Sequence, residues 1–122
     1  MSKPIQKIVF VDDDKIQHMI NKKNLLRLKE DLDLYFFESP YEALDWMGQN
    51  EADLLILHVN MPEMRGWDFL DKLKEMDRMI QVKMLTSSVD PDDVAISMNY
   101  NMVSGFLVKP LRNEVMSEIL GI

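Results

Sequence analysis

The chain has 122 residues, of which 47% are hydrophobic and 29% are charged, and it contains no cysteine. These values are typical of a soluble globular protein, so we expect residues 1–122 to form a single cytoplasmic domain without disulfides or thiolate metal sites. No apolar run reaches the roughly 18 residues of a membrane span, no apolar signal segment follows Met1–Pro4, and the net charge of −7 disfavours binding to nucleic acid or anionic lipid.

The first third of the chain predicts a strand, a helix and a second strand. Lys7–Val11 is apolar and β-branched, and it stops at the acidic triplet Asp12–Asp14, so we expect a buried strand that ends in a loop. A helix should follow from Asp14, which is a good capping residue, to about Lys29, because apolar residues recur there at helical spacing: Ile16, Met19, Ile20 and Leu26. Leu32–Phe37 alternates and is aromatic, which predicts the second strand.

The middle of the chain predicts a helix, a buried strand and another helix. Ser39–Pro40 marks a helix start, and the apolar stripe of that helix is Ala43, Leu44 and Met47, with Gly48 near its end. The run from Asp53 to His58 is apolar between its polar ends, which is typical of a strand buried on both faces and followed by a functional loop. A helix from Gly66 to about Met76 should bury Phe69, Leu70 and Leu73.

The last third of the chain predicts two more strands and two more helices. A fourth strand, Ile80–Leu85, ends at Thr86, and Lys83 within it must reach solvent or lay its stem along apolar surface. The remaining elements are a helix from Asp90–Pro91 to about Tyr100, a strand at Gly105–Val108 closed by Lys109–Pro110, and a helix at Leu111–Leu120.

Strand and helix alternate five times, which predicts an α/β fold: a doubly wound, five-stranded parallel sheet with helices on both faces. In such sheets the functional crevice lies at the carboxyl ends of the strands. The ends of four strands carry polar residues, and we expect these to converge: Asp12, Asp13, His58, Thr86 and Lys109. Any one of them alone is more simply a solvated turn, a helix cap or a surface residue.

From Lys7 to Leu120, the chain resembles the receiver domains of bacterial response regulators. In that family an apolar strand leads to a phosphate-accepting aspartate, followed by Met-Pro and then Gly. Here the strand, Met61–Pro62 and Gly66 match, but His58 stands in the aspartate's place. The segments Leu85–Ser88 and Ser104–Leu107 match as well. The resemblance implies a flavodoxin-like (βα)5 fold with strand order 2-1-3-4-5, and a non-enzymatic role in two-component phosphorelay signal transduction.

The resemblance also implies a role for each polar residue. Asp12 and Asp13 would bind Mg²⁺, Asp13 directly and Asp12 largely through water, and the backbone carbonyl of Asn60 would complete the protein ligands. Of the remaining positions, Thr86 would close over a phosphoryl group, Lys109 would pair with its oxygens, Phe106 would be the aromatic switch residue, and the Lys109–Pro110 bond would be cis.

His58 compromises both tasks of the missing aspartate, which are to attack phosphorus and to ligate Mg²⁺. A neutral imidazole offers one lone pair, and Mg²⁺ prefers oxygen, so we expect weakened Mg²⁺ binding and no phosphorylation of the standard kind. Phosphorylation on the ring nitrogen would need a geometry other than the one built for Asp, and a misplacement of about 1 Å can cost 10²-fold in rate. His58 could instead pair with Asp12 or Asp13 through a hydrogen bond, or bind a transition metal together with them.

The leading hypothesis is therefore a stand-alone receiver domain that acts through protein contacts. The resemblance implies a sensor histidine kinase or phosphotransfer protein as one partner, and a downstream protein that binds the face formed by the fourth helix, fifth strand and fifth helix. An alternative is a phosphohydrolase of the haloacid-dehalogenase type, because Val11–Asp14 contains Asp-x-Asp, although Lys15 stands where Thr or Val is expected. Another alternative is a purely structural interaction module, which would need no pocket.

Overall fold

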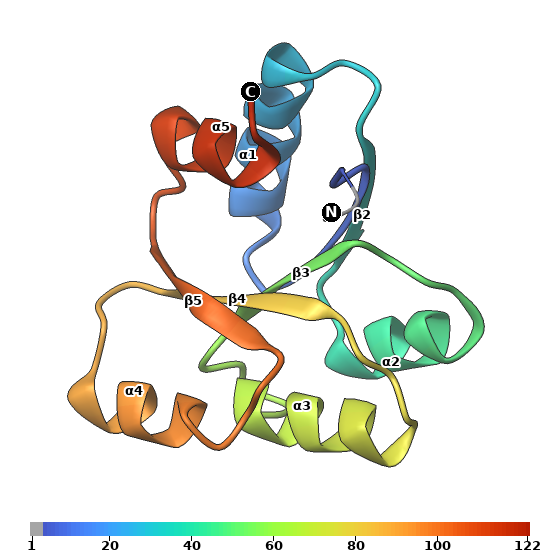
Figure 1. Ribbon diagram of the computed structural model, residues 1–122, viewed down its shortest axis with the longest axis vertical. Helices are drawn as coiled ribbons and strands as arrows, with labels where there is room; N and C mark the ends of the chain where they lie inside the picture. The colour runs from blue at the N-terminus through green and yellow to red at the C-terminus, as the bar shows by residue number, and fades with distance from the viewer. Residues whose placement is uncertain (1–3) are drawn as a thin grey trace.

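Five strands and five helices alternate in the computed structural model, which describes residues 4–122 (Figure 1). The strands are β1 (Lys7–Val11), β2 (Asp33–Phe37), β3 (Leu54–His58), β4 (Gln81–Thr86) and β5 (Val103–Val108). The helices are α1 (Lys15–Leu28), α2 (Pro40–Gln49), α3 (Gly66–Glu75), α4 (Pro91–Ser97) and α5 (Asn113–Leu120). Residues 1–3, which we assigned to the same domain and in which we expected no signal segment, lie outside the described residues.

The five strands pair in parallel in the order β2-β1-β3-β4-β5, which confirms the predicted doubly wound, flavodoxin-like fold. The chain runs from β1 outward to β2, then crosses to β3 on the other side of β1. The strand order therefore reverses between β1 and β3. The crevice at the carboxyl ends of these two strands is where sheets of this kind bind ligands.

Two hydrophobic layers cover the sheet, with α2, α3 and α4 on one face and α1 and α5 on the other (Figure 1). β3 contributes to both layers: Leu55 and Leu57 pack in the first, and Leu54 and Ile56 in the second. All four side chains are fully buried, as the continuous apolar run predicted. Burial on both faces fixes β3 firmly, and with it the position of the residue at its end.

α1 is helical and capped by Asp14 as predicted, but three of the four apolar residues that indicated the helix do not face the sheet. Ile16, Met19 and Ile20 are 71%, 66% and 46% exposed, whereas Leu26 is partly buried against the core. The buried residues of the helix are His18, Asn21 and Leu25. His18 can face inward because its ring N–H donates to the backbone carbonyl of Asp12 in the preceding loop.

Three boundaries differ from the predictions by two or three residues. β5 begins at Val103 instead of Gly105, because Val103 already pairs with Val82 before the register shifts by one residue. α4 ends at Ser97, short of Tyr100, and α5 begins at Asn113 instead of Leu111. Lys83 is half-buried and its Nζ donates to the Ser104 carbonyl at 3.3 Å, which agrees with a stem laid along the sheet. No helix among residues 4–122 is long and apolar enough to cross a membrane.

Candidate metal and phosphate site

The carboxyl ends of β1 and β3 bring three metal-ligating residue types together. One side-chain donor atom from each of Asp12, Asp13 and His58 lies within 4.8 Å of the others. Asp12 is buried with 2% of its surface exposed, Asp13 is exposed, and His58 is half-buried. The predicted convergence of these residues is therefore present in the structure.

Lys109, at the end of β5, reaches into the same cluster. Its Nζ lies 2.7 Å from Asp12 Oδ2 and 4.0 Å from Asp14 Oδ2. The Lys109 backbone N–H donates to the Thr86 carbonyl at 2.9 Å, which extends the pairing of β4 and β5, and the Lys109–Pro110 peptide bond is cis, as the resemblance implied. An ammonium group thus already contacts the buried carboxylate.

His58 does not form the hydrogen-bonded pair with Asp12 or Asp13 that we considered from the sequence. Within residues 4–122, no hydrogen bond or ion pair joins its ring to Asp12 or Asp13, and its Nδ1 is buried without a hydrogen-bond partner. The expected pairing is therefore wrong. The physical reason is that the Lys109 ammonium group already contacts the Asp12 carboxylate and compensates its charge.

The other predicted site residues are engaged in contacts outside the cluster. The Thr86 hydroxyl donates to the Ser88 carbonyl at 2.8 Å, so it is engaged with the loop that leads to α4. Phe106 is half-buried against the core layer beneath α3. Asn60 is exposed and forms an isolated bridge with Arg65, which closes the loop between β3 and α3.

Gly66 allows this loop to close tightly over the end of β3. Its backbone N–H donates to the Val59 carbonyl at 2.7 Å. A Cβ atom at position 66 would lie 2.8 Å from the His58 carbonyl oxygen and 2.9 Å from Met84 Cε, both too close for a side chain. The glycine that the family pattern requires is thus explained by close packing of α3 against β3.

Sequence analysis missed His18, which contacts the backbone of Asp12 in the cluster. His18 is buried, and its Nε2 lies 2.7 Å from the Asp12 carbonyl oxygen and 3.3 Å from that of Phe37, so Nε2 carries the proton and donates. The bond ties α1 to the backbone of the buried acid. The available signal was the spacing of His18, Asn21 and Leu25, which places them on one face of a helix.

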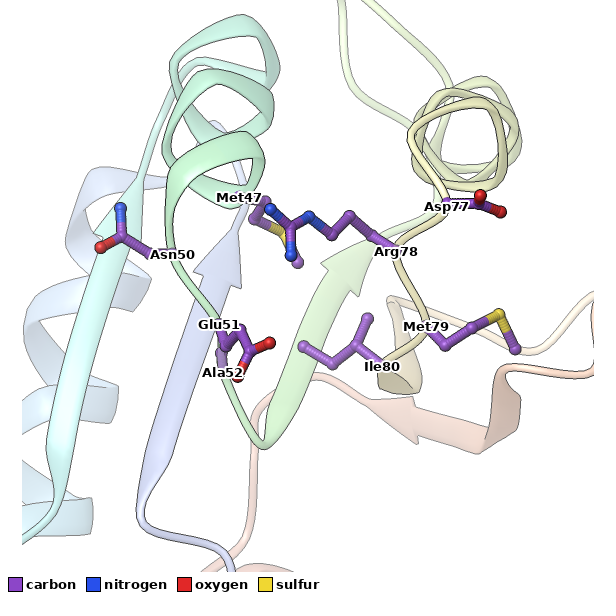
Figure 2. Close-up of a pocket in the computed structure, with 8 residues that line it drawn as sticks. All are labelled: Met47, Asn50, Glu51, Ala52, Asp77, Arg78, Met79 and Ile80. Atoms are coloured by element: carbon purple, nitrogen blue, oxygen red, sulfur yellow. The ribbon is translucent and has the colours of Figure 1, made fainter.

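The opposite, amino end of the sheet holds a hollow of about 350 Å³, shown in Figure 2. Arg78 extends across it, and its Nη2 donates to the Gly48 carbonyl at 2.9 Å. Among the described residues, the three-residue group that could hold a metal lies at the carboxyl end and not here. We therefore assign the functional site to the carboxyl end.

Comparison with known proteins identifies the family. The family described as response regulator receiver domain matches residues 8–120. The chain is 31% identical over 117 residues to a chemotaxis protein CheY homolog of Campylobacter jejuni, covering 93% of this chain and 88% of that protein. The chain therefore belongs to the response regulator receiver domain family, whose members act in two-component signalling.

Other relatives are longer than this chain. It is 30% identical over 107 residues to the cyclic di-GMP phosphodiesterase response regulator RpfG of Xanthomonas campestris pv. campestris, covering 86% of this chain but 28% of that protein. The chain spans less than half the length of three further curated relatives that it matches, at 35%, 45% and 45%. The shared part is the receiver domain, a signalling domain that is generally non-enzymatic, so the haloacid-dehalogenase alternative is not favoured.

Solved structures agree with the fold. The chemotaxis protein CheY4 of Vibrio cholerae superposes with a TM-score of 0.79 at 25% identity, covering 96% of this chain and 97% of that one. A two-component response regulator from Cytophaga hutchinsonii gives a TM-score of 0.83 at 22% identity, covering 98% and 96% of the two chains.

Receiver domains bind Mg²⁺ at this acidic cluster, but the donors of this chain do not fit that ion. His58 places a nitrogen where the family has a carboxylate oxygen, and Mg²⁺ binds oxygen in near-ideal octahedral geometry. Lys109 Nζ also lies 2.7 Å from Asp12 Oδ2, so a cation already contacts this carboxylate. The site retains the acids of a receiver domain without the donor set that Mg²⁺ requires.

Proposed function

We propose that this chain is an atypical receiver domain that is not phosphorylated in the standard way and signals through protein contacts. The observation that carries the proposal is the imidazole of His58 at the end of β3, beside Asp12 and Asp13. The ring offers no carboxylate to attack phosphorus. The surrounding residue types of a receiver site are otherwise present, which points to a change of regulation with the fold retained.

The direct test is incubation with acetyl phosphate and Mg²⁺, followed by intact mass spectrometry. The wild-type chain should gain no phosphoryl group, whereas His58→Asp should gain one, because Asp13, Thr86 and Lys109 already match their family positions. His58→Asn is the matched control: it has nearly the shape of Asp, but no nucleophilic oxygen, and should stay unmodified. A phosphoryl group mapped to His58 in the wild type would refute the proposal, and failure of a folded His58→Asp would show that more of the site has changed.

We further propose that a downstream protein binds the face of α4, β5 and α5, and that a sensor histidine kinase or phosphotransfer protein contacts the same domain in the cytoplasm. The proposed face exposes apolar side chains: Met98 is 79% exposed, Val108 49% and Val115 36%. Val115 also lines a hollow of about 380 Å³ formed by the end of β5 and the start of α5. Apolar side chains beside a concave surface are typical of protein contacts.

This surface can be tested with charge substitutions and a matched control. Val108→Lys should abolish cross-linking to the downstream partner in cells of the source organism, because a charge would be buried at the contact. Ile16→Lys on α1 is the control, since Ile16 is equally apolar and 71% exposed but lies on another face. Loss of cross-linking in Ile16→Lys with retention in Val108→Lys would move the contact to α1 and overturn this part of the proposal.

A further inference from the structure

The donor set at the carboxyl ends of β1 and β3 suits a different kind of metal ion from the one the family binds. Two carboxylates and one imidazole come from Asp12, Asp13 and His58. Imidazole is a good ligand for Zn²⁺, Ni²⁺ and Cu²⁺, and carboxylate oxygens complete such sites readily, whereas Mg²⁺ selects oxygen. The exchange of one residue type therefore changes the class of cation that the cluster favours.

His58 carries a buried polar atom without a partner, which is independent evidence for a ligand. In residues 4–122, its Nδ1 is buried and forms neither a hydrogen bond nor an ion pair. Asp12 is 98% buried, given its exposed fraction of 2%, and its Oδ2 is paired only through the charge of Lys109 at 2.7 Å, without hydrogen-bond geometry. Unpaired buried polar atoms are rare in proteins and often mark a site where an ion or water belongs.

The spacing of the donors requires only a small closure. The atoms lie within 4.8 Å of one another, whereas zinc ligands at about 2.0 to 2.2 Å from the metal stand roughly 3.4 Å apart in a tetrahedron. Asp12 is held in place because its Oδ1 accepts the Asp14 backbone N–H and its carbonyl accepts from His18. Asp13 is exposed, so we expect its side chain to rotate toward the other two. A fourth position remains for water.

We propose that Asp12, Asp13 and His58 form a binding site for a divalent transition-metal ion, with Zn²⁺ as the leading occupant, which bridges the ends of β1 and β3. Lys109 acts as an internal competitor of the metal, because its ammonium group already contacts the Asp12 carboxylate at 2.7 Å. The inference goes beyond the proposed function, since a receiver domain can escape phosphorylation with or without a bound metal.

The experiment is isothermal titration calorimetry of the full chain with zinc chloride and, separately, magnesium chloride. We expect one Zn²⁺ per chain and much weaker Mg²⁺ binding. His58→Asn and Asp13→Asn should each lower the Zn²⁺ affinity by at least about 10- to 100-fold. Loss of a residue that only hydrogen-bonds to a metal ligand typically costs this much, and loss of a ligand itself should cost no less. His58→Asp should reverse the preference toward Mg²⁺. Asp45→Asn, an exposed acid on α2, is the matched control and should leave Zn²⁺ binding unchanged.

Two further measurements distinguish a specific three-ligand metal site from nonspecific binding of the metal to carboxylates. Co²⁺ in place of Zn²⁺ should give a visible absorption band that is absent in His58→Asn, because the band depends on a nitrogen ligand in a low-coordinate site. Lys109→Met should raise the Zn²⁺ affinity, since it removes the competing cation. Equal Zn²⁺ affinity in the wild type and in folded His58→Asn, or Mg²⁺ binding as tight as Zn²⁺ binding, would overturn the inference. Neither result would affect the acetyl phosphate test, so the two proposals fail separately.

Discussion

The two ends of the sheet differ in how their buried polar groups are hydrogen-bonded. At the amino end, Asp53 Oδ2 accepts the backbone N–H groups of Gln6 and Lys7 at 2.9 and 2.8 Å, and Arg78 donates to Gly48. At the carboxyl end lie the three buried side-chain atoms that have no hydrogen-bond partner in the described part of the chain: Asp12 Oδ2, His18 Nδ1 and His58 Nδ1. The polar groups named at the amino end are satisfied by hydrogen bonds, whereas the carboxyl end retains buried atoms without hydrogen bonds, of which Asp12 Oδ2 is compensated only by the charge of Lys109.

The largest effect on stability should come from crowding the carboxyl end at Gly66. Gly66→Ala should lower the free energy of unfolding by about 3 kcal/mol, because the new Cβ meets a backbone oxygen that cannot move aside. Urea denaturation measures the change. Gly48→Ala is the control in α2: its Cβ would lie 3.5 Å from Met76 Cε, an ordinary contact, so this variant should gain up to about 1 kcal/mol. Equal effects of the two variants would mean that the loop after β3 is not tightly closed.

At the amino end, Asp53→Ala should lower the free energy of unfolding by about 2 kcal/mol, because two partly buried backbone N–H groups lose their acceptor. Hydrogen exchange should speed up at Gln6 and Lys7. Asp53→Asn keeps one acceptor oxygen and should lose less. Wild-type stability in Asp53→Ala would show that the amino end does not depend on this carboxylate, and the contrast between the two ends would fail.

A smaller effect of opposite sign is expected at Asp13. Asp13→Asn should raise the free energy of unfolding by about 0.5 kcal/mol in a chelating buffer, because Asp13 stands between two further carboxylates, Asp12 and Asp14, with which Lys109 already forms ion pairs. Urea denaturation of Asp45→Asn gives the baseline for removing an acid elsewhere on the surface. A loss of stability in Asp13→Asn would mean that this acid contributes to the fold as well as to the site.

The smallest effect, confined to alkaline pH, concerns Tyr100 before β5. Burial, together with a 2.8 Å hydrogen bond from its hydroxyl to Asp71, raises the pKa of Tyr100 from its ordinary 10.0 to about 12. A raised pKa in the folded state means that the neutral phenol stabilises the fold below pH 10.0, and that this contribution is lost as the pH rises toward 12. The stability advantage of wild type over Tyr100→Phe should therefore shrink across this window, and Asp71→Asn should flatten the dependence. A constant advantage would contradict the assignment.

The strands were predictable from the sequence because burial on both faces leaves a continuous apolar run, of which Leu54–Leu57 is the clearest case. The inward face of α1 was not predictable from apolar spacing. Its core-facing position 18 carries a histidine, since the backbone of Asp12 needs a donor, while Ile16 and Met19 remain exposed. A hydrophobic pattern cannot reveal a helix that buries polar side chains against backbone carbonyls.

The convergence of the site residues followed from topology, because each stands at the end of its own parallel strand. Which of these residues contact one another could not be predicted from topology. Whether His58 or Lys109 contacts Asp12 depends on side-chain length and on the path of the chain after β5, and neither is encoded in spacing. The roles assigned to Thr86, Phe106 and Asn60 stay predictions, since they concern a phosphorylated or metal-bound state.

The backbone at position 58 is held without help from its side chain. His58 pairs with Leu85 in the ladder between β3 and β4, the next N–H donates to the Leu85 carbonyl at 3.0 Å, and Gly66 packs against the His58 carbonyl oxygen. Histidine and aspartate codons differ by a single base. A single point mutation can thus exchange an imidazole for a carboxylate at the end of β3, while the backbone contacts around position 58 stay in place.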